Sequence, residues 1–402
     1  MKIAFYINSL DSGGGERVVS LLSLALNGDF KKYILLNERV IKYPYEGKLH
    51  VFCDSIKGKK LRKLWMESYI PSAFALGSFL KREAIDVCIS MDNYTNKINI
   101  LSLSRAKKVL RFGNYFSWFG KKRWSFKPAY YRWLYSRADS LIAISKGVAE
   151  ELCGFGLDEE KVRVIYNPIL LKEILLKCGE NLPINLGDYI LNVGRLHEQK
   201  GQWHALRIFR ELKKFFPYLK LVILGEGPLK DELVKLSQSL SFKTFVWDRD
   251  VLSEDYDVYF MGFEPNPFKY MRHAKISLFA SLWEGLPNAL IEALACGSCV
   301  VSADCRSGPR EILAPDTDFK REAEEPEFVN YGILMPVLER QFMYHDEPLT
   351  GRERKWVKVL CELLDRPEIV ESYRKKAFLR AKDFDLTKIE AEWRKLISDV
   401  LS

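Results

Sequence analysis

Two glutamates, Glu284 and Glu292, stand on either side of a predicted helix start whose surroundings suit an anionic ligand. Apolar residues recur at helical spacing from Leu290 to Ala295, and the turn Ser281–Leu286 precedes them. Pro287 stands where a first helical residue has no need of an N–H group. Because the N–H groups at a helix start attract phosphate, we expect an anionic ligand here. The simpler alternative is an ordinary helix with two surface glutamates.

Two cations, Arg195 and Lys200, lie in the segment NVGRLHEQKG, which follows a predicted strand and opens a predicted helix. Two fixed cations in such a turn suit a phosphate ligand. The alternative interpretation is a solvated basic turn. Its place directly after a strand favours the phosphate interpretation.

Glycines mark two further turns that follow predicted strands. Gly13-Gly14-Gly15 precedes Glu16 and follows the first strand, and glycine lets a backbone approach a ligand closely. Val18 replaces the last glycine of a dinucleotide fingerprint, which argues against a nicotinamide site. Gly225 and Gly227 end a later strand, where a plain strand-to-helix turn explains them equally well.

The elements that must position these residues alternate between strand and helix, which predicts an α/β fold with parallel sheets covered on both faces. One series of strands begins at Lys2–Asn8 and a second at Tyr189–Val193. Between them, residues 168–187 have weak periodicity and hold the chain breakers Pro168, Gly179, Pro183 and Gly187. We therefore predict an N-terminal domain of residues 1–175, joined by a C-terminal helix at 385–402, and a second domain of residues 186–384.

The segment EGLPNALIEALACG, from Glu284 to Gly297, resembles the E-x7-E signature of bacterial GT-B glycosyltransferases of family 4. The elements around Arg195 and Lys200 and around Gly14 are similar to that family's G-R…K-G and GG-x-E-R motifs. The resemblance implies two Rossmann-like domains facing a central cleft, with the last helix crossing back onto the N-terminal domain. It also implies a sugar transferred with retention of configuration, and no metal or other cofactor.

The same resemblance assigns roles to individual residues. Glu284 would contact the donor sugar and Glu292 the ribose hydroxyls, while Arg195 and Lys200 would bind the diphosphate. Further substrate-binding residues implied by the motifs are Gly14, Gly15, Gly225, Phe263, Gly285, Leu286, Pro287 and Asn288. Many family members carry a histidine after the strand at 108–112. Arg111 and Asn114 stand there instead, and we expect them to reach the sugar or the acceptor.

A basic and aromatic segment, residues 105–137, contains ten Lys or Arg residues, eleven aromatic residues and no acid. Such a composition suits the surface of an anionic membrane, where aromatic rings lie at the level of the lipid headgroups. The net charge of +9 also favours anionic partners. A solvated basic face is the alternative, and single-stranded nucleic acid, which such interleaving also suits, ranks last.

Composition restricts the class of protein further. No apolar run approaches the roughly 20 residues of a membrane span, and the N-terminal residues lack a secretory pattern. We therefore expect a cytoplasmic protein, peripheral on the inner face of the cell membrane. The eight cysteines include one C-x-x-C, at Cys296 and Cys299, without a second pair at zinc spacing. Repeated D-x-D patterns are interpreted as solvated loop charges.

The sequence therefore predicts a hexosyltransferase that uses a nucleotide-diphosphate sugar, here a UDP-sugar. The predicted acceptor is a lipid-linked saccharide or a lipopolysaccharide or capsule precursor. One alternative is a nucleotide-sugar 2-epimerase of the same fold, although only five histidines are present to supply acid and base groups. Another is a non-catalytic subunit that binds the sugar nucleotide.

Overall fold

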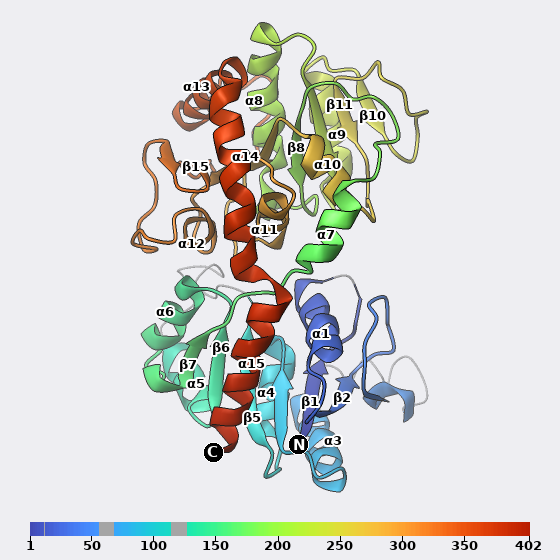
Figure 1. Cartoon of the computed structure of the whole chain (residues 1–402), viewed down its shortest axis with the longest axis vertical. Helices are drawn as coiled ribbons and strands as arrows, with labels where there is room; N and C mark the ends of the chain where they lie inside the picture. The colour runs from blue at the N-terminus through green and yellow to red at the C-terminus, as the bar shows by residue number, and fades with distance from the viewer. Residues whose placement is uncertain (12, 56–67, 114–126) are drawn as a thin grey trace. The chain divides into compact units, whose positions relative to one another are not determined.

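The chain divides into two compact units, which are described separately. The computed structural model describes residues 1–11, 13–55, 68–113 and 127–402. Unit 1 comprises residues 1–168 and 385–402, and unit 2 comprises residues 169–384 (Figure 1). Asn114 and the centre of the basic and aromatic segment lie outside the described residues.

Unit 1 is built on a parallel sheet whose described strands run in the order β3-β2-β1-β4-β5-β6-β7. The order reverses between β1 and β4, so the connections leave the sheet in opposite directions there. The strands are β1 (Lys2–Ile7), β2 (Lys31–Leu36), β3 (Lys48–Val51), β4 (Val87–Ser90), β5 (Lys107–Phe112), β6 (Ser140–Ala143) and β7 (Val162–Val164).

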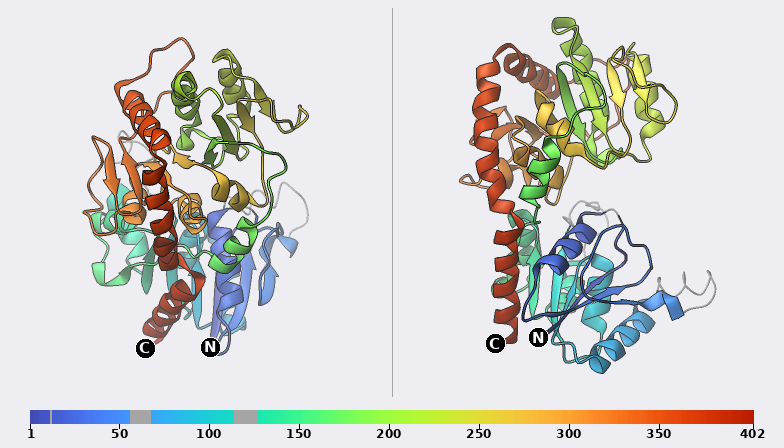
Figure 2. Two further views of the ribbon diagram at one scale, coloured as in Figure 1. Left: turned by 45° about the horizontal axis from the view of Figure 1, so that its top comes forward. Right: turned by 45° about the vertical axis from the view of Figure 1, so that its right-hand side comes forward.

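Helices cover both faces of this sheet (Figure 2). Alternate residues of β1 separate the two cores: Phe5 packs with α1 and α15, whereas Tyr6 packs with α3 and α4. The described helices are α1 (Gly14–Ala25), α3 (Tyr69–Arg82), α4 (Asn93–Leu101), α5 (Lys127–Tyr135), α6 (Lys146–Gly154) and α15 (Leu386–Leu401).

The last helix, α15, packs on unit 1, as the sequence predicts. Its buried face consists of Ile389, Trp393, Leu396 and Ile397, which join the core that contains α1. Arg163 beside β7 adds an ion pair to Asp399 at 2.7 Å. The carboxyl-terminal residues therefore complete the core of the unit formed by the amino-terminal half.

Unit 2 is built on a second sheet, with the described strand order β10-β11-β9-β8-β12-β13-β15-β14. All pairings are parallel except that of the edge strand β14 with β15. The strands are β8 (Tyr189–Val193), β9 (Lys220–Leu224), β10 (Thr244–Val246), β11 (Val258–Phe260), β12 (Ile276–Phe279), β13 (Val300–Ala303), β14 (Glu327–Val329) and β15 (Gly332–Met335).

Helices also lie on both faces of this second sheet (Figure 2). They are α7 (Leu171–Cys178), α8 (Gln202–Phe215), α9 (Lys230–Ser239), α10 (Pro267–His273), α11 (Asn288–Ala295), α12 (Pro309–Leu313), α13 (Gly351–Asp365) and α14 (Pro367–Ala381). The weakly periodic stretch 168–187 contains α7, which the sequence analysis does not predict. Its chain breakers Pro168 and Gly179 flank the helix rather than interrupt it.

A buried ion network joins α8 to α13. Glu353 is fully buried and accepts hydrogen bonds from Arg207 Nε and from the Thr350 amide, both at 2.9 Å. Its carboxylate also lies 2.7 Å from His204 Nδ1. Burial alone would raise the pKa of Glu353, but the hydrogen bonds from His204, Arg207 and Thr350 outweigh it and hold this pKa at about 2. The network therefore fixes α13 on α8 through a charged carboxylate.

Replacing the buried carboxylate tests this network. Glu353→Gln leaves the Arg207 guanidinium buried without a counter-charge, so we expect a loss of about 3–5 kcal/mol in the free energy of unfolding at pH 7. The folded-state pKa lies below the unfolded value of about 4.3, so the carboxylate stabilises the fold above that pH and ceases to do so as pH falls toward about 2.

Denaturant unfolding at a series of pH values measures the effect. The stability difference between wild type and Glu353→Gln should be constant above about pH 5 and narrow between about pH 4 and pH 2. Glu371→Gln, which removes an exposed carboxylate, serves as the control. A difference that is independent of pH over this range would contradict the assignment.

Candidate active site

The predicted donor-site residues of unit 2 gather at the carboxyl ends of β8 and β12, which are adjacent in the sheet. The strand order reverses at this pair, because β9 lies on one side of β8 and β13 on the far side of β12. Open α/β sheets bind their ligands beside such a reversal. The turn after β8 carries Arg195 and Lys200, and the turn after β12 carries Glu284.

Lys200 and Glu284 form an ion pair between these two turns. Lys200 Nζ lies 2.5 Å from Glu284 Oε1, and Gln199 Nε2 donates to Glu284 Oε2 at 3.1 Å. The Glu284 side chain is 6% exposed and that of Lys200 is 21% exposed. The carboxylate is therefore held inside the protein by two donors, while the ammonium group still reaches the solvent.

Backbone contacts fix the two turns against each other. Leu282 N donates to Gln199 O at 2.8 Å, and Gln199 Nε2 donates to Trp283 O at 2.9 Å. Gly201 has φ of 58°, and a Cβ added there would lie 2.5 Å from Ala280 O. Only glycine therefore allows the turn after Lys200 to approach the end of β12 this closely.

A third turn, after β13, supports the start of α11. Ser307 N donates to Glu284 O at 3.0 Å, and Ser307 Oγ donates to Gly285 O at 2.9 Å. Gly308 has φ of 104°, and a Cβ there would lie 2.7 Å from Pro287 Cδ. The loop Glu284–Pro287 is thus clamped between the turns that follow β8 and β13.

Helix α11 begins one residue later than the sequence analysis expects. Pro287 has extended backbone angles and is the N-cap, so Asn288 is the first helical residue. A proline has no N–H group to satisfy at this position either. Glu292 follows one turn later and is buried, and Leu286 is buried before the helix. The positive end of the helix therefore adjoins Glu284 and Lys200.

Three other predicted residues occupy the same edge of the sheet. The Arg195 side chain is exposed, and its carbonyl accepts from Gln202 Nε2 at 3.0 Å. Gly225, with φ of 137°, donates its N–H to Gly262 O, and a Cβ there would lie 2.1 Å from Gly194 O. Gly225 therefore lets the turns after β8 and β9 pack together. Phe263 is 68% exposed.

Cys305 lies beneath the ion pair. It is buried, and burial together with the negative charge of Glu284 raises the pKa of its thiol well above the usual value. The thiol therefore stays protonated beside the carboxylate. Among the residues that the structure describes, no group of three or more His, Cys, Asp and Glu side chains is arranged to hold a metal ion.

Two of the predicted residues of unit 1, Gly15 and Arg111, meet at the reversal between β1 and β4. Gly14 and Gly15 begin α1, and a Cβ on Gly15 would lie 3.8 Å from Arg111 Nη1. Arg111 is buried; its Nη2 donates to Asn167 Oδ1 at 2.5 Å and its Nη1 to Met91 O at 3.4 Å. Its guanidinium therefore lies directly under the glycine turn.

Two carboxylates influence this buried cation. Burial lowers the pKa of Arg111 to about 10, and the charges of Glu16 and Asp92 partly offset that effect. Burial raises the pKa of both Glu16 and Asp92. Asp92 also accepts from the Tyr94 and Thr95 amides and so caps α4. A pKa of about 10 lies above neutral pH, so Arg111 keeps its charge there, and the charges of Glu16 and Asp92 favour that charged form.

Comparison with known proteins gives the family. Residues 12–173 match the family model described as Glycosyltransferase Family 4, and residues 181–320 match that of Glycosyl transferases group 1. A Campylobacter jejuni protein is 31% identical over 406 residues, which cover 96% of this chain and 97% of that protein. The chain belongs to the GT-B glycosyltransferases of family 4.

The relatives of this glycosyltransferase carry informative names. The C. jejuni relative is named as an N-acetylgalactosamine-N,N'-diacetylbacillosaminyl-diphospho-undecaprenol 4-alpha-N-acetylgalactosaminyltransferase. A lipopolysaccharide 1,6-galactosyltransferase from Salmonella typhimurium is 24% identical over 90% of this chain and 96% of its own length. An uncharacterized glycosyltransferase from Methanocaldococcus jannaschii is 37% identical, over 52% of this chain and half of that protein.

A solved structure shows the same fold. Anabaena Alr3699/HepE in complex with UDP superposes with a TM-score of 0.72 at 16% identity, over 99% of this chain and all of that one. This similarity establishes the GT-B fold of the glycosyltransferase. The predicted α/β class with two Rossmann-like domains is therefore confirmed.

The structure adds residues that the sequence analysis does not predict. In unit 2, Gln199 binds Glu284, and Ser307 and Gly308 support the loop before α11. The glycine-proline pair at 308–309 signals a turn, but nothing local shows which loop that turn contacts. In unit 1, Asp92 lies beside Arg111. The sequence signal for Asp92 is its capping pattern with Thr95 directly after a strand, which indicates a helix start there.

Proposed function

We propose that this glycosyltransferase transfers a sugar from a UDP-sugar with retention of configuration, and that unit 2 binds the donor. The observation that supports this most directly is the Lys200–Glu284 ion pair beside the start of α11. This arrangement offers a cation and a helix N-terminus to the diphosphate, and carboxylates to the sugar hydroxyls.

The ion pair leaves capacity for the donor on both partners. An ammonium group has three N–H donors, and Lys200 uses one on Glu284, so two are available for diphosphate oxygens. Each Glu284 oxygen accepts one protein hydrogen bond and has room for a second from a sugar hydroxyl. We assign Arg195 to the same diphosphate and Glu292 to the ribose hydroxyls.

These groups suit a reaction in which negative charge develops on the leaving diphosphate. Lys200 and Arg195 are positioned on the protein before the reaction, so they stabilise that charge more in the transition state than in the ground state. The acceptor hydroxyl attacks the anomeric carbon as its bond to the diphosphate oxygen breaks. The leaving phosphate oxygen takes the hydroxyl proton, so no separate carboxylate base is needed.

The names of the relatives support a lipid-linked saccharide or a lipopolysaccharide precursor as the acceptor.

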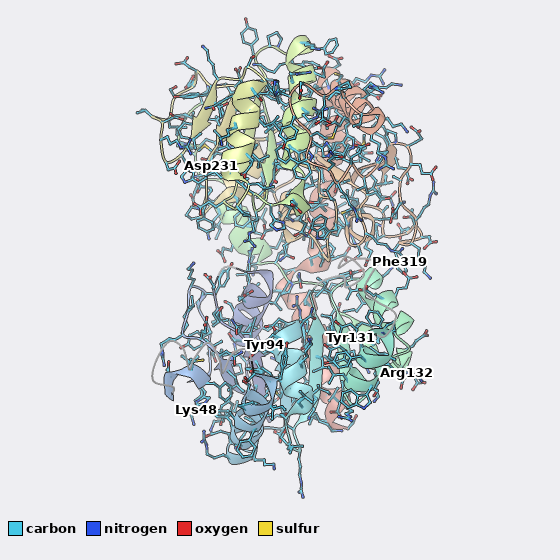
Figure 3. The ribbon with its side chains drawn as sticks, turned by 180° about the vertical axis from the view of Figure 1, so that it is seen from behind. Lys48, Tyr94, Tyr131, Arg132, Asp231 and Phe319 are labelled. Atoms are coloured by element: carbon cyan, nitrogen blue, oxygen red, sulfur yellow. The ribbon has the colours of Figure 1, made fainter. Side chains whose placement is uncertain are left out.

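We propose a peripheral protein on the cytoplasmic membrane face, because residues 105–137 are basic and aromatic. In the described part of that segment, α5 exposes Trp133 and Tyr130, and Arg137 stacks on Trp133 with 4.6 Å to the ring centre. Figure 3 labels Tyr131 and Arg132 on the same helix. None of the helices in the described ranges combines the length and apolarity that a membrane crossing requires.

Removing either partner of the ion pair tests the donor site. We expect Lys200→Ala to lower kcat by about 10²–10³, the usual cost of losing a group that stabilises developing charge. Glu284→Gln should lower kcat as well, because it removes the carboxylate that binds the sugar hydroxyls and holds Lys200 in place. The measurement is acceptor-dependent release of UDP from a UDP-sugar, with a saccharide linked to undecaprenyl diphosphate as the acceptor. Lys214→Ala, which removes an exposed lysine paired with Glu211, is the control.

Two results would overturn this assignment. One is full activity in both variants, with melting temperatures equal to that of wild type. The other is conversion of the UDP-sugar without any acceptor, which would favour the 2-epimerase.

Vesicle binding tests the membrane proposal. We expect the protein to sediment with vesicles that contain about one third phosphatidylglycerol and not with pure phosphatidylcholine, because basic residues are drawn to anionic lipid. Trp133→Ala combined with Arg137→Ala should weaken this binding, whereas Phe328→Ala, an exposed aromatic residue of unit 2, should not. Equal sedimentation with both lipids, or no effect of the double substitution, would contradict the proposal.

A further inference from the structure

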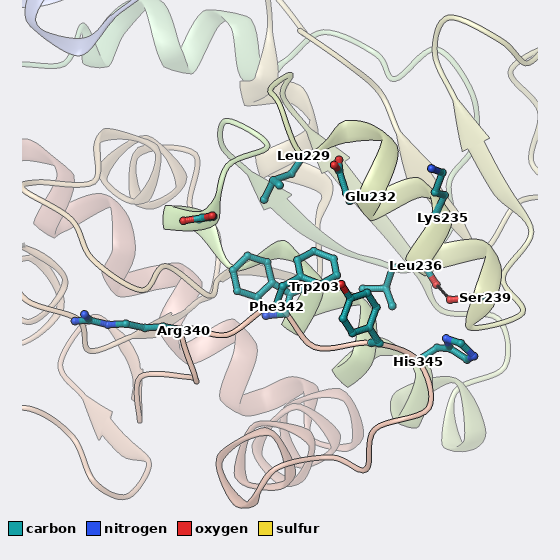
Figure 4. A pocket seen from close by; sticks show the side chains of 11 residues that line it. Trp203, Leu229, Glu232, Lys235, Leu236, Ser239, Arg340, Phe342 and His345 are labelled. Atoms are coloured by element: carbon teal, nitrogen blue, oxygen red, sulfur yellow. Dashed lines mark hydrogen bonds between the residues drawn. The ribbon is translucent and has the colours of Figure 1, made fainter. Parts of the chain in front are cut away.

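Unit 2 contains a cavity of about 440 Å³ that the proposed reaction does not use. Its walls come from the turn that carries Glu198, the first turn of α8, helix α9 and the loop 340–345 that follows β15 (Figure 4). The volume falls within the range of about 300–1,000 Å³ that is typical of small-molecule sites. Glu198 is two residues before Lys200, so the cavity adjoins the segment that holds the ion pair.

The lining has an apolar centre. Trp203 and Phe342 pack with ring centroids 5.2 Å apart, and Tyr344 packs on Phe342 at 5.5 Å. Leu229 and Leu236 complete the apolar surface from the side of α9. Aromatic rings in this number give a pocket that can hold the flat face of a ring-shaped ligand.

The polar groups of the lining carry both signs of charge. Glu198 and Glu232 are exposed carboxylates, and within the described residues neither forms an ion pair. Lys235 lies one helical turn from Glu232, and Figure 4 shows both on α9. A phosphate would meet the two carboxylates, and an organic cation would meet Lys235 and Arg340, so a neutral ligand with many hydroxyls fits best. A purely apolar tail would leave these polar groups without partners.

The wall formed by the loop is held in place by buried charges. Arg207, already paired with Glu353, donates to the carbonyls of Tyr344, Glu347 (3.2 Å) and Pro348 (2.9 Å). At the start of the loop, His204 Nε2 lies 2.7 Å from Glu339 O. Three buried ionisable side chains thus fix the backbone of a loop whose side chains line the cavity. A pocket wall fixed in this way loses little conformational entropy when a ligand binds.

We propose that this cavity is a saccharide-binding site, separate from the donor site. A pyranose ring has apolar C–H faces that pack on Phe342 and Tyr344, and its hydroxyls donate to Glu198 and Glu232. Lys235 donates to a ring or hydroxyl oxygen. This site does not depend on the proposed transfer reaction, because it uses none of the residues assigned to the donor.

The experiment titrates the full-length protein, saturated with UDP, with the methyl glycosides of glucose, galactose and the two N-acetylhexosamines, followed by ligand-observed NMR. At least one glycoside should bind. Tyr344→Ala and Glu232→Gln should each weaken that binding about tenfold, because each removes a side chain in direct contact with the sugar. Both side chains are exposed, so neither substitution should disturb the fold. Tyr218→Ala and Glu371→Gln, at exposed positions outside the cavity, are the matched controls.

Binding should also persist in Lys200→Ala, which separates this proposal from that of the donor site. The proposal is wrong if no glycoside binds, or if Tyr344→Ala and Glu232→Gln bind as wild type does. It is equally wrong if saturation with UDP abolishes the binding, or if a short isoprenol occupies the cavity and the glycosides do not.

Discussion

The Lys200–Glu284 ion pair is the constraint on which the proposed donor site depends. A carboxylate as buried as Glu284 is stable in its charged form only when donors surround it, and Lys200 and Gln199 provide them from a turn 84 positions earlier. The pair therefore prevents the turns after β8 and β12 from moving apart. Gly201 and Gly308 allow the close backbone approach that this contact requires.

The strand order of the two sheets explains where the candidate site residues lie. In the described part of each sheet the strand order reverses near the centre, between β1 and β4 in unit 1 and between β8 and β12 in unit 2. The loops beside a reversal diverge and leave room for a ligand. In unit 1 the buried cation Arg111 occupies this place and is compensated by Glu16 and Asp92. In unit 2 the partly exposed side chain of Lys200 occupies the corresponding place beside the reversal.

The sequence predicts the fold well because the signals are local. Alternating strands and helices, and the apolar face of α15 around Trp393, depend on neighbours in the chain. The predicted start of α11 is one residue too early, because proline is accepted both at the N-cap and at the first helical position. Helix α7 is not predicted, because it lies in the stretch 168–187, where chain breakers indicate a domain boundary, and only Ile174 and Cys178 of the helix are buried.

The sequence predicts less of the site, because its geometry depends on contacts between distant segments. The motifs assign Lys200 and Glu284 to the same donor site, but nothing local indicates that the two form an ion pair or that Gln199 also donates to the carboxylate. Arg111 was expected to reach the sugar or the acceptor. The structure shows it bonded to Asn167 and Met91, and its role toward a ligand stays a prediction. The roles of Gly14 and Gly15 toward a ligand also stay predictions. Asn114 lies outside the described residues.

The central claim is that Lys200, together with Arg195 and the start of α11, binds the leaving diphosphate of a nucleotide sugar. A crystal structure of the UDP complex tests this most directly. We expect phosphate oxygens within hydrogen-bond distance of Lys200 Nζ and of the first amides of α11. The ribose hydroxyls should donate hydrogen bonds to Glu292. A diphosphate bound away from these groups, with the Lys200–Glu284 pair free of any contact to it, would contradict the claim.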